Sequence, residues 1–136
     1  MLHVLIIDDD KGISAMLKCA LIPHGYDVET SSNGTEGTAA FDKGCYDAVI
    51  TDICMPGMNG TNVAHYIRDS AKPLTPVIGI SGTPWLLDSG DFDAVLEKPF
   101  SISALLSTLQ LLTKKKRCLP GLQTGSKETT AVAKSA

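Results

Sequence analysis

Aspartates occur at two places where they could take part in metal or phosphoryl chemistry. Asp8, Asp9 and Asp10 are consecutive, and Asp52 follows another apolar run much later in the chain. Carboxylates that are brought together repel one another, and their pKa values rise unless a positive charge joins them. A hard divalent cation such as Mg²⁺, which prefers carboxylate, carbonyl and water oxygens, would meet that need. The sequence therefore suggests a magnesium site built largely of acidic side chains.

Two further polar residues could complete such a site. With a metal bound, a free oxygen of Asp52 could attack a phosphoryl donor and form an acyl phosphate. Lys98 would then offer a compact positive charge to the phosphoryl oxygens, and the Ser81 hydroxyl could donate a hydrogen bond to them.

Each of these residues also has an ordinary structural explanation. The aspartates at 8–10 could end a strand in solvent, and Asp52 could belong to a turn before a Pro-Gly loop. Ser81 precedes Gly82 and could also lie in a turn, while Lys98 could be a surface lysine. Every explanation is credible for one residue, but their coincidence at four strand ends favours a common site.

The elements that would position these residues alternate along the chain. Apolar, strand-sized runs cover residues 2–7, 26–30, 46–51, 77–80 and 93–97. Helices are expected at residues 35–43 and 61–71, and apolar side chains recur at helical spacing in two further stretches: Ile13, Met16, Leu17, Ala20 and Leu21 before Pro23 and Gly25, and Leu105, Leu106, Leu109 and Leu112 after the capping Ser101.

Alternation of strands and helices predicts an α/β fold, in which a single doubly wound sheet of five parallel strands is covered on both faces. In such sheets the working site lies beyond the carboxyl ends of the strands. Asp8–Asp10, Asp52, Ser81 and Lys98 follow four different strands, so we expect them at the same edge of the sheet.

Composition is that of an ordinary globular protein, with 43% apolar residues, 20% charged residues and a net charge of −3. This charge argues against a general affinity for nucleic acid or anionic membranes. The apolar runs are too short to span a bilayer, and the N-terminus lacks the features of a secretion signal. We therefore expect a cytoplasmic protein with one domain at residues 1–116 and a disordered tail at residues 117–136.

Several motifs resemble the receiver domain of two-component response regulators. They are the run VLIIDDD at residues 4–10, DICMPGMNG at residues 52–60, Ser81, and KPF at residues 98–100. The resemblance extends from the N-terminus through the last helix. It implies a flavodoxin-like strand order, 2-1-3-4-5.

The resemblance also implies roles for individual residues. Asp52 would be the phosphoacceptor, and Asp8 and Asp9 the acidic pair that helps to hold Mg²⁺. Asp9 and Asp52 would bind the metal directly, together with the backbone carbonyl of Cys54. The donor would be a phosphohistidine on a sensor histidine kinase or a histidine phosphotransfer protein. Ser81 and Lys98 would then sense the phosphoryl group and shift the domain between two states.

The sequence departs from the family pattern in two places. Receivers usually carry Tyr or Phe three residues before the lysine, whereas this chain has Val95. Phe92 has an odd offset from Val95, which in a strand predicts the opposite face. The stretch from Ser81 to Lys98 is shorter than is typical of the family, so the fourth helix is expected to be shortened or irregular. Trp85, within that stretch, could lie in the core, in a lid or in an exposed contact.

Two other functions remain open from the sequence. Val95 and the short fourth-helix region would suit a pseudo-receiver, a protein-interaction module that keeps the fold without accepting phosphate. A small phosphohydrolase of the haloacid dehalogenase type would use Asp8 and Asp10 as its nucleophile motif. That hypothesis gives the Asp52 loop no role, so a phosphoacceptor is the leading interpretation and a turnover enzyme is not expected.

Overall fold

The structure is a computed structural model, and it describes residues 1–83 and 90–118. Five strands and four α-helices lie in this part of the chain: β1 (Leu2–Ile7), α1 (Lys11–Leu21), β2 (Tyr26–Ser31), α2 (Gly34–Lys43), β3 (Ala48–Asp52), α3 (Gly60–Arg68), β4 (Val77–Ser81), β5 (Ala94–Glu97) and α4 (Ile102–Cys118). A short 3₁₀ helix (Ile22–His24) follows α1 and ends at Gly25.

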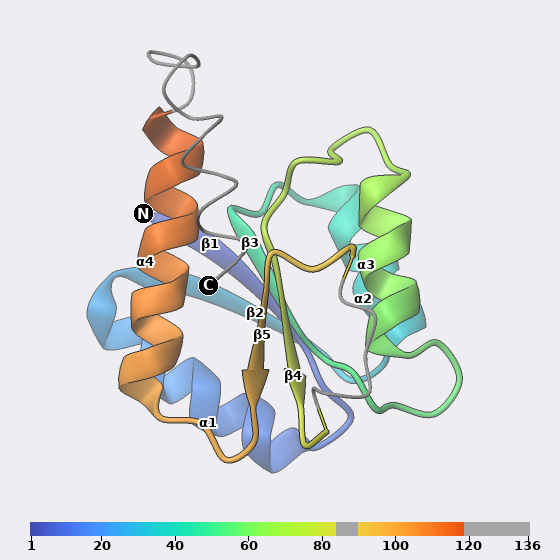
Figure 1. The fold of residues 1–136 in the computed structure, drawn as a ribbon, viewed down its shortest axis with the longest axis horizontal. Helices are drawn as coiled ribbons and strands as arrows, with labels where there is room; N and C mark the ends of the chain where they lie inside the picture. The colour runs from blue at the N-terminus through green and yellow to red at the C-terminus, as the bar shows by residue number, and fades with distance from the viewer. Residues whose placement is uncertain (84–89, 119–136) are drawn as a thin grey trace.

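All five strands form one parallel sheet in the order β2-β1-β3-β4-β5 (Figure 1). The fold class and the strand order predicted from the sequence are confirmed. The register aligns the carboxyl ends of neighbouring strands: Ile7 pairs with Thr51, Asp52 with Ile80, and Ser81 with Glu97. Residues that directly follow β1, β3, β4 and β5 therefore meet at one edge of the sheet.

Side chains alternate between the two faces of each strand, and each face has its own apolar cluster. Val4 and Ile6 of β1 pack in the cluster that contains Leu17 of α1 and Leu105 of α4. Leu5 and Ile7 pack instead in the cluster with Phe41 of α2 and with Val63, Ala64 and Ile67 of α3. The sheet is thus covered on both faces, as expected for a parallel sheet.

Some element bounds differ from those that the sequence predicted. Helix α3 ends at Arg68 rather than at residue 71, because local side chains take up the backbone groups there. The Ser70 hydroxyl donates to the carbonyl of Ile67, and the Arg68 guanidinium donates to the carbonyls of Pro73 and Thr75. Such side-chain bonds compete with another helical turn.

Phe92 does not lie on the face predicted for it. Both Phe92 and Val95 contact the cluster on the α2–α3 side, and Phe92 is only 5% exposed. The prediction that Phe92 points away from Val95 is wrong because Phe92 precedes the first residue of β5, Ala94, so that strand alternation does not apply to it.

Two predictions concern segments outside the described residues. The shortened or irregular helix predicted between Ser81 and Lys98 falls mostly within residues 84–89, which also include Trp85. Most of the predicted tail falls within residues 119–136. Helix α4 continues to Cys118, so the proposed boundary at residue 116 stays a prediction. None of the helices in the described part of the chain has the length and apolarity that crossing a bilayer requires.

Candidate functional site

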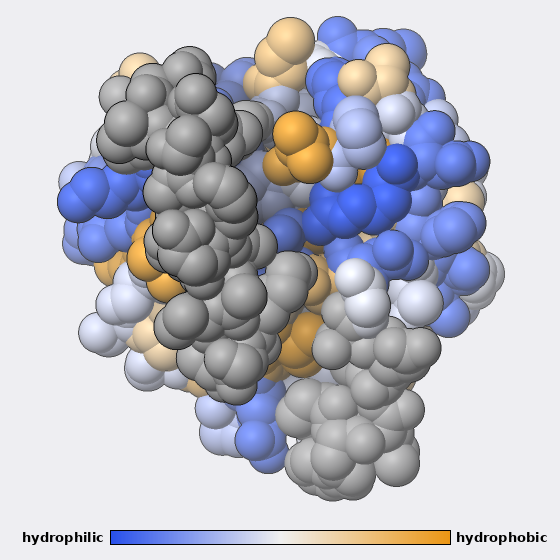
Figure 2. All heavy atoms as spheres, turned by 45° about the horizontal axis from the view of Figure 1, so that its top comes forward, coloured by the Kyte–Doolittle hydropathy of each residue, from blue (hydrophilic) through white to orange (hydrophobic). Residues whose placement is uncertain are grey.

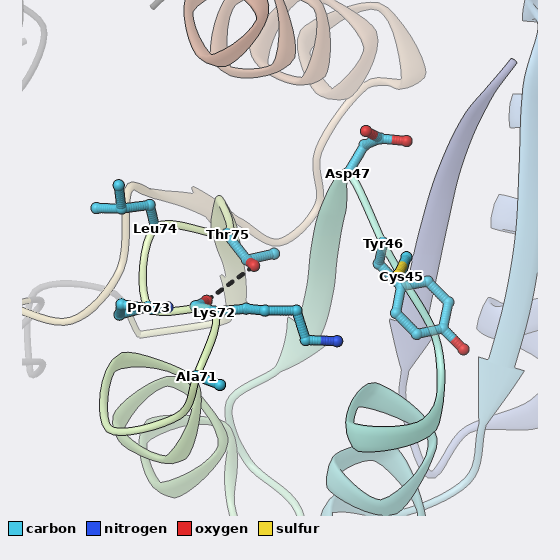
Figure 3. A pocket seen from close by; sticks show the side chains of 8 residues that line it. All are labelled: Cys45, Tyr46, Asp47, Ala71, Lys72, Pro73, Leu74 and Thr75. Atoms are coloured by element: carbon cyan, nitrogen blue, oxygen red, sulfur yellow. Dashed lines mark hydrogen bonds between the residues drawn. The ribbon is translucent and has the colours of Figure 1, made fainter. Parts of the chain in front are cut away.

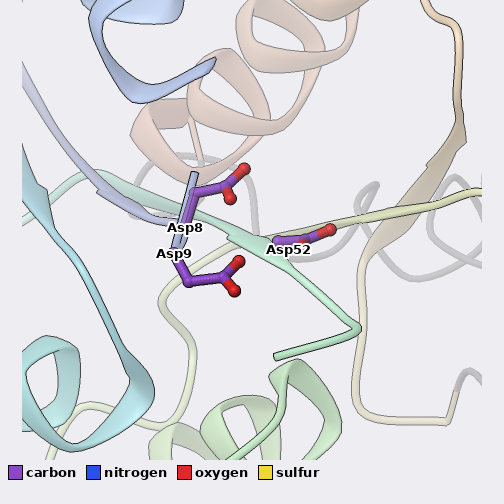
Figure 4. A group of neighbouring side chains, drawn as sticks. All are labelled: Asp8, Asp9 and Asp52. Carbon is purple, nitrogen blue, oxygen red and sulfur yellow. The ribbon is translucent and has the colours of Figure 1, made fainter. Parts of the chain in front are cut away.

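Three carboxylates meet at the carboxyl edge of the sheet. Asp8 and Asp9 follow β1, and Asp52 is the last residue of β3. One ligand atom from each lies within 4.8 Å of the others, and Figure 4 shows the three side chains directed to the same side of the sheet edge. The parallel pairing of β1 with β3 places these residues together, as the sequence predicted.

Asp8 is a buried carboxylate whose hydrogen bonds are incomplete. It is 2% exposed, and its Oδ1 accepts a hydrogen bond from the backbone N–H of Asp10 at 2.9 Å. Its Oδ2 is buried and has no hydrogen-bond partner. Burial, together with the charges of Asp52 and Asp9, raises the pKa of Asp8 to about 6 despite the Asp10 N–H bond and the Lys98 charge.

Lys98 is the cation beside the cluster. Its Nζ lies 3.0 Å from Oδ1 of Asp52, and its backbone N–H donates to the carbonyl of Ser81. Burial works to lower the pKa of the Lys98 ammonium, but the contact with Asp52 and the charge of Asp8 outweigh it, so the pKa lies above its ordinary value. Lys98 therefore stays charged at neutral pH.

Ser81 ends β4 and is 2% exposed. Its hydroxyl oxygen accepts a hydrogen bond from the backbone N–H of Thr83 at 3.0 Å. Because the oxygen acts as the acceptor in this bond, the hydroxyl hydrogen remains free to point toward another acceptor. The backbone N–H of Lys98 donates to the carbonyl of Ser81 at 2.8 Å, so the ends of β4 and β5 are hydrogen-bonded to each other.

The loop after Asp52 is held against the start of α3 by a close backbone contact. A Cβ atom on Gly60 would lie 2.5 Å from the carbonyl oxygen of Asp52 and 2.7 Å from the Cα of Ile53. The N–H of Gly60 donates to the carbonyl of Ile53 at 3.0 Å, and Asn59 and Asn62 form a capping box at this helix start. In the sequence Gly60 appears only as the last residue of the motif at residues 52–60, and that motif does not predict its contact with the Asp52 backbone.

Asp10 is separate from this cluster. Its Oδ1 accepts hydrogen bonds from the backbone N–H groups of Gly12 and Ile13, so Asp10 caps the N-terminus of α1. An aspartate committed to a helix cap is a poor match for the phosphohydrolase motif, in which both Asp8 and Asp10 would serve the reaction. The structure thus gives that hypothesis no support.

The donor set fits a hard divalent cation. Three carboxylates converge, and among the described residues the Lys98 ammonium is the only cationic side chain that forms an ion pair with one of them. The buried Oδ2 of Asp8 has no partner, which a metal or its bound water would supply. Oxygen ligands of this kind suit Mg²⁺. The thiol of Cys54 is exposed, and the role of its backbone carbonyl as a ligand stays a prediction.

A cavity lies away from the acidic cluster. It has a volume of about 470 Å³ and is lined by residues 45–47 and 71–75, the segments that lead into β3 and β4 (Figure 3). The Lys72 ammonium next to it donates to the carbonyls of Phe41 and Gly44. Among the residues drawn in colour in Figure 2, hydrophilic side chains predominate on the right of the view, with small apolar patches beside them. The cavity is at the amino ends of the strands, so it is separate from the acidic cluster.

Comparison with known proteins identifies the family. The model of the response regulator receiver domain matches residues 4–110. The chain belongs to this family. Among curated relatives, the transcriptional regulatory protein TcrA of Mycobacterium tuberculosis is 31% identical over 118 residues, which cover 83% of this chain and 46% of TcrA. The receiver chain thus spans about half the length of the curated relatives that it matches.

Solved structures agree with the family. The chemotaxis response regulator CheY4 of Vibrio cholerae is 32% identical, with a TM-score of 0.77 and coverage of 82% of this chain and 98% of that chain. The response regulator TrrA of Thermotoga maritima, solved in complex with Mg²⁺-BeF, is 34% identical, with a TM-score of 0.76 and coverage of 82% and 99%. The chain is a receiver domain of two-component signal transduction.

Proposed function

We propose that this receiver domain accepts a phosphoryl group on Asp52 in a Mg²⁺-dependent reaction and changes its partner binding as a result. The observation that carries the proposal is the convergence of Asp8, Asp9 and Asp52 within 4.8 Å, with the Lys98 ammonium 3.0 Å from Asp52. Such an arrangement supplies both a nucleophilic carboxylate and the positive charge that a transferred phosphoryl group needs.

In the proposed reaction a carboxylate oxygen of Asp52 attacks phosphorus, and the bond from phosphorus to the donor nitrogen breaks. The donor is a phosphohistidine of a sensor histidine kinase or a histidine phosphotransfer protein, and its imidazole leaves with the bonding electron pair. Asp9, Asp52 and the backbone carbonyl of Cys54 would hold Mg²⁺, which would supply positive charge to offset the negative charge of the phosphoryl oxygens. Asp8, the other member of the acidic pair, would help to hold the metal. The protein then acts as a signalling module in the cytoplasm rather than as a turnover enzyme.

After transfer, Lys98 and Ser81 contact the new phosphoryl oxygens. Lys98 leaves its ion pair with Asp52 for a phosphoryl oxygen, and Ser81 donates its hydroxyl hydrogen. Because the Lys98 N–H is bonded to the Ser81 carbonyl, the ends of β4 and β5 respond together. This response shifts the populations of two conformations of the domain. A downstream protein binds one of these conformations more tightly than the other.

One observation favours a different function. Val95 stands where receivers usually carry an aromatic residue, and this suits a pseudo-receiver that binds a partner without phosphorylation. The two functions differ in whether the acidic cluster binds a phosphoryl group or its analogue. The intact pairing of Lys98 with Asp52 favours phosphorylation.

Binding of beryllofluoride in the presence of Mg²⁺ distinguishes the two. We expect a saturable, Mg²⁺-dependent change in the fluorescence of the single tryptophan for the unaltered chain and no change for Asp52→Asn. Asp10→Asn is the matched control, because asparagine also caps helices well and Asp10 lies outside the cluster. A folded chain that binds neither Mg²⁺ nor beryllofluoride would support the pseudo-receiver instead.

A further inference from the structure

Gly79, in the middle of β4, lies where a side chain would collide with two neighbours. A Cβ atom at Gly79 would be 2.9 Å from Cδ1 of Ile53 and 2.9 and 3.0 Å from two ring atoms of Phe92. Packed carbon atoms are normally separated by about 3.5–4.0 Å. The space beside Gly79 is therefore already filled by the Phe92 ring and the end of the Ile53 side chain.

Ile53 connects this packing to the phosphoacceptor loop. It follows Asp52 directly, and its side chain is buried. Its backbone N–H donates to the carbonyl of Ile80, and its carbonyl accepts from the N–H of Gly60, both at 3.0 Å. Ile53, which lies between Asp52 and Cys54 in the chain, is thus hydrogen-bonded to β4 on one side and to the start of α3 on the other.

The segment that carries Phe92 is held in place by hydrogen bonds of the neighbouring residue. Phe92 is 5% exposed, and the side chain of the next residue, Asp93, accepts two hydrogen bonds. Oδ2 of Asp93 accepts from the guanidinium of Arg68 at 2.6 Å and from the backbone N–H of Val77 at 2.8 Å. These bonds tie the segment that carries Phe92 to the end of α3 and the start of β4. The ring therefore has little freedom to withdraw from Gly79.

We propose that Phe92 is a positioning residue for the phosphoacceptor loop: its ring occupies the space that Gly79 leaves and holds Ile53 in the place that Mg²⁺ binding requires. This inference rests on the proposed function of the acidic cluster. Val95, which pairs with Gly79 in the β4–β5 register, is too small to do the same. Metal sites depend on residues that orient the ligands as well as on the ligands themselves.

Replacement of Phe92 by leucine tests this role, with Phe41→Leu as the matched control. Phe41 is a phenylalanine of the same apolar cluster and is 1% exposed, but it belongs to α2, and the atoms nearest to the space at Gly79 come from Ile53 and Phe92 instead. Both variants should unfold at lower urea concentrations than the unaltered chain. Only Phe92→Leu should also weaken Mg²⁺ binding, measured by titration calorimetry, on the order of tenfold, the lower end of what ligand-orienting residues contribute.

A double-mutant cycle tests the shared space directly. Gly79→Ala should displace the Phe92 ring and weaken Mg²⁺ binding. This variant therefore tests the role of Phe92 independently of whether Phe92→Leu folds. In the double variant the smaller leucine should make room for the alanine, so that unfolding midpoint and Mg²⁺ affinity both exceed the values expected from adding the single effects. Additive effects would overturn the proposal.

The outcomes separate this inference from the proposed function. If the unaltered chain binds Mg²⁺ and both Phe92→Leu and Gly79→Ala bind it with the same affinity, the positioning role is overturned and the proposed function is not. Failure of the unaltered chain to bind Mg²⁺ overturns the proposed function, and the positioning role fails with it. A loss of affinity in Phe41→Leu as large as that in Phe92→Leu would show a general effect of stability, which also overturns the proposal.

Discussion

Neutralising Asp8 should stabilise the metal-free protein and at the same time weaken its response to Mg²⁺. The Asp8 carboxylate is 2% exposed, and its Oδ2 has no partner. Its pKa rises from 3.8 to about 6 in the folded state. The folded state therefore binds this proton more tightly than the unfolded state, so the stabilisation is complete below pH 3.8 and is lost as the pH rises through 6.

The pKa difference sets the magnitude. At about 1.4 kcal/mol per pKa unit, ionised Asp8 costs the folded state at most about 3 kcal/mol at neutral pH. Nearby solvent screens part of this cost, and an asparagine amide would also need hydrogen-bond partners in this buried place. We therefore expect Asp8→Asn to raise the free energy of unfolding by about 1–2 kcal/mol at pH 7 in the presence of a chelator.

Urea unfolding across the pH range is the assay. The difference in free energy of unfolding between Asp8→Asn and the unaltered chain should grow between about pH 4 and pH 7. In this range Asp8 ionises first in the unfolded state and then in the folded state. Saturating Mg²⁺ should stabilise the unaltered chain more than the variant. Asp10→Asn, an exposed change in the next residue but one, should show neither effect. An Asp8→Asn variant that is less stable than the unaltered chain at pH 7 without metal would refute this reasoning.

Two further substitutions test the surroundings of the cluster. Lys98→Ala removes the ammonium 3.0 Å from Asp52, so calorimetry should show tighter Mg²⁺ binding while the beryllofluoride response is lost; weaker Mg²⁺ binding would contradict the electrostatic argument. Gly60→Ala places a Cβ atom 2.5 Å from the Asp52 carbonyl oxygen and should lower the free energy of unfolding by about 2–3 kcal/mol. Gly82→Ala, which meets no atom within 4 Å, is the control, and equal losses in both variants would show that the close approach is unimportant.

Much of the candidate site could be predicted from the sequence because it depends on a topological rule. Parallel strands end at one edge, so Asp8, Asp9, Asp52 and Lys98 had to come near one another once the strands were recognised. The rule places strand ends but not side chains. It therefore could not separate Asp9, which points to the cluster, from Asp10, whose carboxylate caps α1.

The contacts around the loop could not be predicted because they depend on three-dimensional packing. Alternation in a strand assigned Phe92 to the wrong face, since Phe92 precedes β5, and its ring lies beside Gly79 of β4. The contact of Gly60 with the Asp52 carbonyl joins the end of β3 to the start of α3, and no local sequence pattern specifies how these two elements lie relative to each other. Helix α3 was predicted too long because the bonds of Arg68 and Ser70 form only in the folded chain.

Phosphorylation of Asp52 is the central claim, and the intact mass of the protein tests it most directly. The chain is incubated with a small acyl-phosphate donor and Mg²⁺, and its mass is compared with that of Asp52→Asn treated in the same way. We predict the added mass of one phosphoryl group on the unaltered chain, its absence when Mg²⁺ is chelated, and its absence in Asp52→Asn. A phosphoryl adduct of the same extent on folded Asp52→Asn, or none on the unaltered chain, would contradict the claim.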